Sequence, residues 1–86
     1  MTDRTSTRQA VRLGMQLRSR RKALGLTQSE VAELAGTTQR TVSLLESGKP
    51  TARLDIIAAV TDTLGLELVA VSRERLAEIA GSESAP

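Results

Sequence analysis

Four glycines divide the middle of this 86-residue sequence into short segments with helical periodicity. They are Gly25, Gly36, Gly48 and Gly65. Each follows such a segment at a place where helices commonly end in a left-handed conformation. Thr27 with Glu30 forms a capping-box pattern, and Thr38 offers a hydroxyl to the start of the next segment. We therefore expect four short helices in residues 9–66, joined by tight turns.

Apolar residues at helical spacing supply the core of these helices, which should span about 9–24, 28–35, 38–47 and 51–64. The predicted inward positions are Leu13, Leu17, Leu24, Val31, Leu34, Ala35, Val42, Leu45, Leu54, Ile57, Val60 and Leu64. Because the chain has no Phe, Tyr or Trp, the core must be aliphatic, and aromatic platforms for single-stranded bases are excluded. The length suffices for one modest core, so we predict a single, small all-α domain.

The two ends of the chain differ from this domain. Residues 1–8 are polar and aperiodic, and we expect a flexible arm. After the fourth helix, the run LELVAV favours a β-strand, and we assign residues 67–72 to a dimerisation strand. A lone strand has unpaired edges, so it should pair with the same strand of a second subunit. Its pairing residues are Leu66, Leu68, Val69 and Val71. Residues 73–86 should form a short helix to Ala80, capped by Ser72, and a disordered tail.

Several classes of protein are excluded by residue content. The chain has no Cys and no His, which removes disulfides, thiolate or imidazole metal sites, and the usual nucleophile–base systems. No paired carboxylates suggest acid–base catalysis, so we expect no enzyme, no cofactor and no bound metal. No apolar run is long enough for a membrane span, and the N-terminus does not look like a secretory signal. A cytoplasmic protein is expected.

Charge is distributed unevenly along the chain. Residues 1–53 hold ten Lys or Arg and four Asp or Glu, a net charge of +6, whereas residues 54–86 hold two and six, a net charge of −4. A basic front half favours a polyanionic partner, although a solvated surface explains the charge equally well. The segment 26–50 is more specific, because two short helices joined by a tight glycine turn are what major-groove reading requires.

This segment resembles the helix-turn-helix of the lambdoid phage repressors and the wider XRE group. The matching residues are Thr27, Gln28, Val31, Ala32, Gly36, Gln39, Val42, Ser43, Leu45, Glu46, Gly48 and Lys49. The resemblance is densest over residues 13–66. The run from Gly48 to Thr51 and the run from Leu64 to Leu68 are similar to the HipB-type antitoxins, which dimerise through a C-terminal strand. That resemblance implies a HipA-like kinase toxin as a possible partner.

Positions in the resembling family suggest the DNA contacts, and side-chain chemistry supports them. The groove-facing candidates are Thr38, Gln39, Arg40 and Ser43. Gln39 suits adenine, while Arg40 suits either a guanine or a phosphate, with neither favoured. Leu44 is usually polar in the family, and we interpret it as core edge rather than a thymine contact. The phosphate candidates are Gln28, Arg18, Arg20, Lys49 and Arg53, each cation being equally explained as a solvated charge. The resemblance also implies a structural ion pair between Arg21 and Glu46.

The sequence leaves three functions open. The first is a dimeric repressor that binds double-stranded DNA at a palindromic operator. The second makes the same dimer the antitoxin of an autorepressed toxin–antitoxin operon. The third is an interaction module without DNA binding. The polar residues at the DNA-contact positions and the basic front half both argue against this third function.

Overall fold

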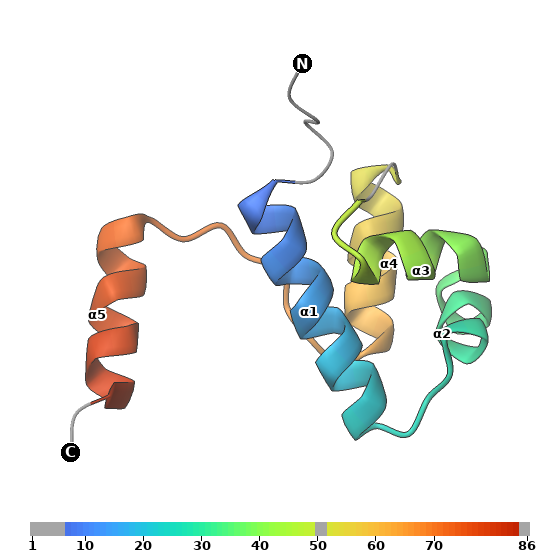
Figure 1. Ribbon diagram of the computed structural model, residues 1–86, viewed down its shortest axis with the longest axis horizontal. Coiled ribbons are helices and arrows are strands. Elements are labelled where there is room, and N and C mark those ends of the chain that lie inside the picture. Colours follow the sequence, from blue (N-terminus) through green and yellow to red (C-terminus); the bar gives the residue numbers. More distant parts are fainter. Residues whose placement is uncertain (1–6, 50–51, 85–86) are drawn as a thin grey trace.

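The computed structural model describes residues 7–49 and 52–84, and all regular structure in that part of the chain is helical (Figure 1). The helices are α1 (Arg8–Ala23), α2 (Gln28–Ala35), α3 (Gln39–Glu46), α4 (Leu54–Thr63) and α5 (Arg73–Ser84). α3 packs against α1 and α2, and α2 packs against α4, whereas α5 stands apart at the end of a linker. The prediction of an all-α fold is confirmed.

A small aliphatic core joins the first four helices. Its buried members are Leu17, Val31, Ala32, Val42, Leu45, Val60 and Leu64, each at most 3% exposed. Leu13, Ala35 and Ile57 pack against it, with Leu26 and Leu66 from the turns. Most of the predicted inward positions are therefore confirmed.

Three predicted core leucines are instead exposed. Leu24, Leu34 and Leu54 are 44%, 68% and 70% exposed. In α2, Val31 and Ala32 are buried and Ala35 is half-buried, and the centre of that face lies about 110° around the helix from Leu34. Helical periodicity predicted a wider buried face for α2 than this two-turn helix has. It also failed to predict that Ala32 is buried.

Local capping determines where α2 and α3 begin and end. Thr27 accepts a hydrogen bond from the Glu30 N–H at 3.0 Å, and the Glu30 carboxylate accepts one from the Thr27 N–H at 2.8 Å. The predicted capping box is thus confirmed, as is the Thr38 cap, whose hydroxyl accepts from the Thr41 N–H. Gly36 ends α2 with φ of 75°, a conformation that a residue with a Cβ rarely adopts. The turn between α2 and α3 is therefore three residues long and tight.

Gly14, which helical spacing does not single out, allows α1 and α3 to approach closely. The residue is buried where α1 meets the C-terminal end of α3. A Cβ there would overlap the carbonyl oxygen of Leu45 and would lie 2.8 Å from that of Glu46. The absence of a side chain at this position lets the backbones of the two helices touch.

The ends of the helical domain differ from expectation. Residues 1–6 of the predicted arm, and the predicted cap Thr51, lie outside the described residues. α1 begins at Arg8 with Thr7 as its cap, and α4 begins only at Leu54. α5 is capped by Ser72 as predicted, but it extends to Ser84 rather than ending at Ala80. A glycine within a helix costs only about 1 kcal/mol relative to alanine, so Gly81 does not end it.

The predicted strand is not formed in this chain. Residues 66–72 have no regular secondary structure and link α4 to α5 (Figure 1). A strand exists only when another strand completes its hydrogen-bond ladder. The described part of the single chain contains no second extended segment. Residues 66–72 therefore have no strand to pair with.

Candidate nucleic-acid interface

The first turns of α3 present a polar face to solvent. Thr38, Gln39 and Arg40 are exposed and Ser43 is half-buried, whereas Val42 and Leu45 on the opposite side are buried in the core. The Arg40 side chain forms no hydrogen bond or ion pair with any residue that the structure describes. The Thr38 hydroxyl is occupied by the cap of α3 and by a 3.0 Å contact with the Thr41 hydroxyl. The predicted groove-facing candidates thus lie together at one end of α3.

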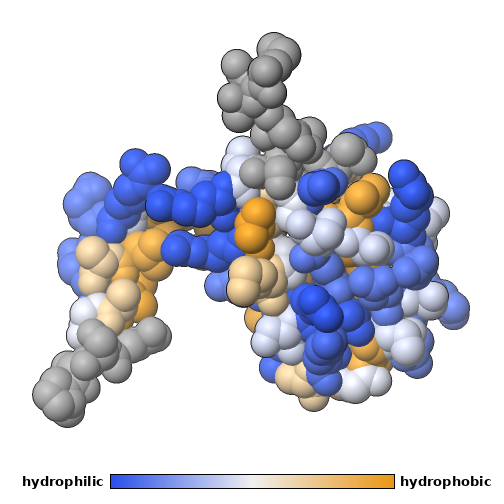
Figure 2. Space-filling view, in the orientation of Figure 1, coloured by the Kyte–Doolittle hydropathy of each residue, from blue (hydrophilic) through white to orange (hydrophobic). Residues whose placement is uncertain are grey.

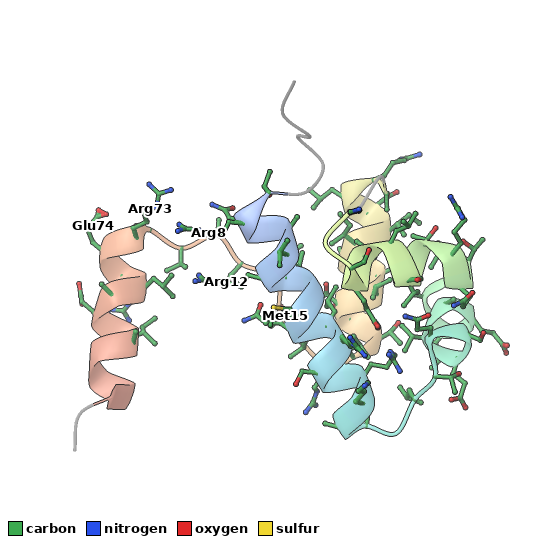
Figure 3. The ribbon with its side chains drawn as sticks, in the orientation of Figure 1. Arg8, Arg12, Met15, Arg73 and Glu74 are labelled. Atoms are coloured by element: carbon green, nitrogen blue, oxygen red, sulfur yellow. The ribbon has the colours of Figure 1, made fainter. Side chains whose placement is uncertain are left out.

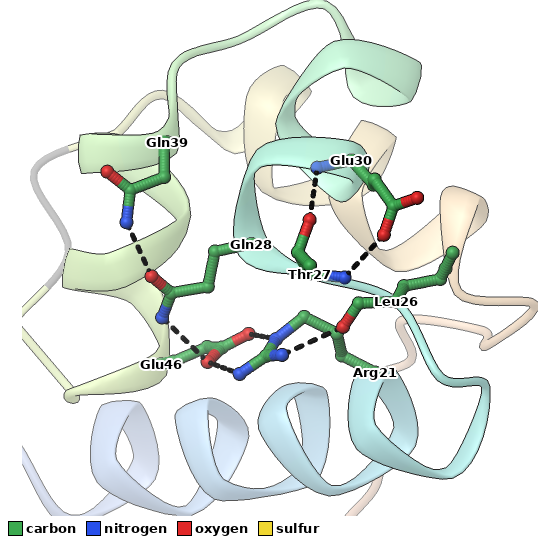
Figure 4. Close-up of polar contacts among 7 residues, drawn as sticks. All are labelled: Arg21, Leu26, Thr27, Gln28, Glu30, Gln39 and Glu46. Atoms are coloured by element: carbon green, nitrogen blue, oxygen red, sulfur yellow. Dashed lines mark hydrogen bonds and ion pairs between the residues drawn. The ribbon is translucent and has the colours of Figure 1, made fainter.

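A chain of hydrogen bonds runs from α1 to the tip of α3 behind this face (Figure 4). Arg21 donates twice to the Glu46 carboxylate, from Nε at 2.6 Å and from Nη2 at 2.9 Å. Its remaining terminal nitrogen donates to the Leu26 carbonyl oxygen at 2.9 Å. Gln28 donates to Glu46 at 3.0 Å and accepts from the Gln39 side-chain amide at 2.6 Å. The ion pair that the family resemblance implied is therefore present, and it anchors a longer relay.

The Arg21–Glu46 pair is mostly shielded from water. The two side chains are 12% and 5% exposed. Burial acts to raise the pKa of Glu46, but hydrogen bonds from Arg21 and Gln28 and the charges of Arg21 and Arg18 outweigh it and lower the pKa below 4.5. The hydrogen bond to Glu46 raises the pKa of Arg21, against the effect of its own burial. Both groups are therefore charged at neutral pH, and the pair joins α1 to α3 electrostatically.

Gln28 has a role that the sequence did not reveal. It was predicted to contact phosphate from the N-terminus of α2, but its amide connects Glu46 with Gln39. Its Oε1 holds the side chain of Gln39, a candidate for base contact. The partners of Gln28 lie 18 and 11 residues away along the chain. No local pattern predicts that pairing, because it depends on the angle between α2 and α3.

Arg18 lies at the edge of a shallow polar hollow beside this relay. The hollow has a volume of about 230 Å³. It is lined by Arg18, Arg21, Gln28, Ser43, Glu46 and Ser47. Since Glu46 already neutralises Arg21, Arg18 contributes the uncompensated positive charge of this hollow. It therefore lies next to α3, where a phosphate contact was predicted.

The other predicted phosphate contacts fall in two different places. Lys49 is exposed directly after α3, and its backbone N–H closes the helix on the Leu44 carbonyl oxygen at 3.0 Å. The Arg53 side chain is 84% exposed, and within the described residues its ion pair is a surface one with Asp55, at 3.2 Å. Arg20 instead donates from Nε to the Leu64 carbonyl oxygen at 2.9 Å, at the end of α4. Arg20 thus links α1 to α4, away from the hollow.

The paired short helices and their tight turn match a known family model, described as helix-turn-helix, over residues 17–71. The chain belongs to the helix-turn-helix family. It is similar to an uncharacterised HTH-type transcriptional regulator of Methanothermobacter thermautotrophicus, with 41% identity over 51 residues, 59% of this chain and 74% of that protein. Its structure is similar to the crystal structure of the clp gene regulator ClgR from C. glutamicum, with a TM-score of 0.66 and 30% identity, covering 93% of this chain and 97% of that one.

Within residues 7–49 and 52–84, no cluster of three or more Asp or Glu side chains is placed to hold a metal ion. In the same part of the chain, no helix is both long enough and apolar enough to cross a membrane.

Proposed function

We propose that this helix-turn-helix protein is a transcriptional regulator that binds double-stranded DNA in a sequence-specific manner, with α3 in the major groove. The observation that carries the proposal is the polar face of α3, with the Gln39 side chain held by Gln28. A side chain oriented before binding loses less rotamer entropy on meeting a base. The names of the similar proteins, both of them regulators, support the same conclusion.

Gln39 retains the groups that an adenine contact needs. Its amide nitrogen has two N–H bonds, and one of them is donated to Gln28. The second N–H and the carbonyl oxygen remain for the adenine edge, which takes one of each. Arg40, which is exposed beside it, suits the O6 and N7 atoms of guanine. Ser43 and Thr38 complete the proposed set of base contacts.

Phosphates on either side of the groove would be held by cations around α3. The proposed contacts are Arg18, Lys49 and Arg53, together with the backbone N–H groups at the start of α2. Gln28 remains in the proposed set because its amide nitrogen has two N–H bonds and donates one of them to Glu46. We leave Arg20 out of the proposed set, because its guanidinium is engaged at the end of α4. Arg53 would have to exchange Asp55 for a phosphate, which costs little because both side chains are exposed.

The protein would act as a homodimeric repressor on a palindromic operator, in the compartment that holds the DNA. Leu68, Val69 and Val71 are 41%, 73% and 46% exposed, which is consistent with a linker that pairs with its copy in a dimer. Leu66 already packs against the core and would take less part in that pairing.

An antitoxin role remains the second candidate. It rests on the resemblance of residues 48–51 and 64–68 to the HipB-type antitoxins, and a HipA-like kinase would then be the partner. A stand-alone regulator agrees equally well with the geometry and needs no second protein. Native mass spectrometry of the protein from its own cells distinguishes the two, because only the antitoxin carries a kinase-sized partner.

DNA recognition is tested by selecting an operator from random sequences and then measuring the affinity of two Arg40 variants. Arg40→Ala should weaken operator binding by about 1–3 kcal/mol and relax one base position. Arg40→Lys is the matched control, because it keeps the charge but loses the planar fork that reads guanine. It should relax the same position while keeping its affinity for random DNA.

The results also separate the alternatives. If Arg40→Ala loses as much affinity for random DNA as for the operator, Arg40 contacts a phosphate rather than a base. If selection yields no sequence that binds more tightly than random DNA, the proposed sequence-specific function is wrong.

A further inference from the structure

Glu46 lies beneath the proposed DNA-binding surface. That surface is mostly hydrophilic over α2 and α3, as Figure 2 shows. The Glu46 side chain is 5% exposed, so it is shielded from contact with DNA. Glu46 is nevertheless connected with Gln39, because both of them bond to the side chain of Gln28 (Figure 4). A buried residue at the end of α3 is thereby linked to a candidate base contact at its start.

The carboxylate of Glu46 allows only one arrangement of the two glutamine amides. An ionised carboxylate accepts hydrogen bonds but cannot donate them, so Gln28 must turn its amide nitrogen toward Glu46. That nitrogen donates at 3.0 Å. The carbonyl oxygen of Gln28 then faces Gln39, which must present its own amide nitrogen, and the nitrogen donates at 2.6 Å. The carboxylate therefore sets the direction of donation along the whole relay.

The carboxylate is itself held in a fixed orientation. Arg21 donates to Oε2 of Glu46 at 2.6 Å and to Oε1 at 2.9 Å. The third hydrogen bond of Arg21, to the Leu26 carbonyl oxygen, fixes the guanidinium in turn. Oε1 of Glu46 accepts from both Arg21 and Gln28, so the position of the Gln28 amide depends on the ion pair between α1 and α3.

The direction of donation decides which atoms Gln39 offers to a base. Because the nitrogen of Gln39 is held at Gln28, its second N–H and its carbonyl oxygen remain in one fixed order. An adenine edge, with an acceptor at N7 and a donor at N6, requires a donor and an acceptor side by side. If the amide of Gln28 were reversed, its N–H would bind the carbonyl oxygen of Gln39 and turn that amide over. Donor and acceptor would then be exchanged across the base edge.

We propose that Glu46 is a positioning residue for base recognition, which touches no DNA but sets the base preference of Gln39 through the amide of Gln28. The proposal rests on the proposed DNA-binding function and adds a residue that determines its specificity. If Glu46 served only as the structural partner of Arg21, its loss would change the stability of the fold and leave the base preference as it was.

The test measures base preference in the full-length protein. Gln39→Ala identifies the operator position that Gln39 contacts, where a preference of about 5- to 150-fold should be lost. Glu46→Ala should lower the preference at that position by about 2- to 10-fold, because Gln39 must then be ordered on binding. The position read by Arg40 should keep its preference. Partial unfolding lowers the affinity for every sequence by the same factor, so it does not change the ratio of two affinities.

Two further variants control for the charge and for the fold. Glu74→Ala also removes one carboxylate, from an exposed position on α5, and in Figure 3 α1 lies between Glu74 and α3. It should change no base preference. Glu46→Asp keeps a carboxylate for Arg21 but is shorter by one methylene group and should not reach Gln28. It should therefore fold more stably than Glu46→Ala and still relax the position that Gln39 reads.

The relay is also observable without DNA. In the free wild type, the side-chain amide of Gln39 should give NMR order parameters of a restricted group. In Glu46→Ala and Glu46→Asp it should become as mobile as the amide of Gln16, which is exposed on α1. An equally restricted Gln39 in both variants would overturn the proposal.

The binding data give two more decisive outcomes. A full preference at the Gln39 position in both Glu46 variants would overturn the proposal. Combining Gln39→Ala with Glu46→Ala should lose no more preference than Gln39→Ala alone, and additive losses would mean that Glu46 acts on another contact. Failure of the proposed function looks different, because in that case the wild type itself selects no operator.

Discussion

Removal of Arg21 is the most informative perturbation of the fold. Arg21→Ala deletes two hydrogen bonds to Glu46 and one to the Leu26 carbonyl oxygen. The Glu46 carboxylate, 5% exposed, keeps only the hydrogen bond from Gln28. Breaking a buried pair from one side costs about 3–5 kcal/mol. Two charges about 4 Å apart at an effective dielectric constant of about 20 attract by about 4 kcal/mol, which lies within that range.

A loss of this size is large for a small domain. A chain of 86 residues has a free energy of unfolding of roughly 4–13 kcal/mol. Urea unfolding followed by circular dichroism measures the change, because the chain has no Trp or Tyr for fluorescence. Arg75→Ala is the control, since it removes the arginine of a surface pair whose side chains are 66% and 69% exposed. The control should cost less than about 1 kcal/mol.

The pH dependence of the same measurement tests the physical cause. In the wild type the pKa of Glu46 is lowered, so its contribution to stability is present above pH 4.5 and is lost as the pH falls through the lowered pKa. In Arg21→Ala burial should raise that pKa, and the variant should lose stability as the pH rises through it. The difference in the free energy of unfolding between the wild type and Arg21→Ala should therefore become smaller at acidic pH. A cost below about 1 kcal/mol at pH 7, or a difference independent of pH, would refute the argument.

Three further measurements test other parts of the structure. Gly14→Ala should lower the free energy of unfolding by about 1–3 kcal/mol, because its Cβ would overlap backbone atoms of α3, whereas Gly81→Ala, whose Cβ meets no atom within 4 Å, should not. Val69→Pro should weaken the dimer in sedimentation experiments, since proline removes a donor from the proposed ladder; an unchanged dimer would exclude that ladder. With Arg18, Lys49 and Arg53 on phosphates in both copies, operator affinity should fall about 10³-fold between roughly 50 and 200 mM salt, and a flat response would contradict these contacts.

Local chemistry explains why much of the fold was predictable. The C-terminal ends of the first four helices and the starts of α2 and α3 were predicted from glycines and hydroxyl caps, because a cap is a hydrogen bond between residues three or four positions apart. The capping box of Thr27 and Glu30 is such a bond. The buried residues Val42 and Leu45 follow from helical spacing in the same way. The base-contact candidates on α3 were found by their position in the motif, and they remain proposals.

Residues whose partners lie far along the chain were not predictable. Arg20 was assigned to phosphate, but it reaches the end of α4, 44 residues away. Leu34 has the spacing of a core residue but faces solvent, because α2 has only one narrow packed face. The strand expected at residues 67–72 depends on a second strand to pair with, which no property of the segment itself supplies.

The sequence by itself determined the helices, their caps and the position of the recognition segment, because these depend on hydrogen bonds and side-chain spacing within a few residues. Only the tertiary structure decided that Gln28 connects Glu46 to Gln39 and that Gly14 brings α1 against α3. It also decided that α5 stands apart with its apolar face uncovered. These features depend on the angles and distances at which helices pack, which are set by the whole core and not by any one segment.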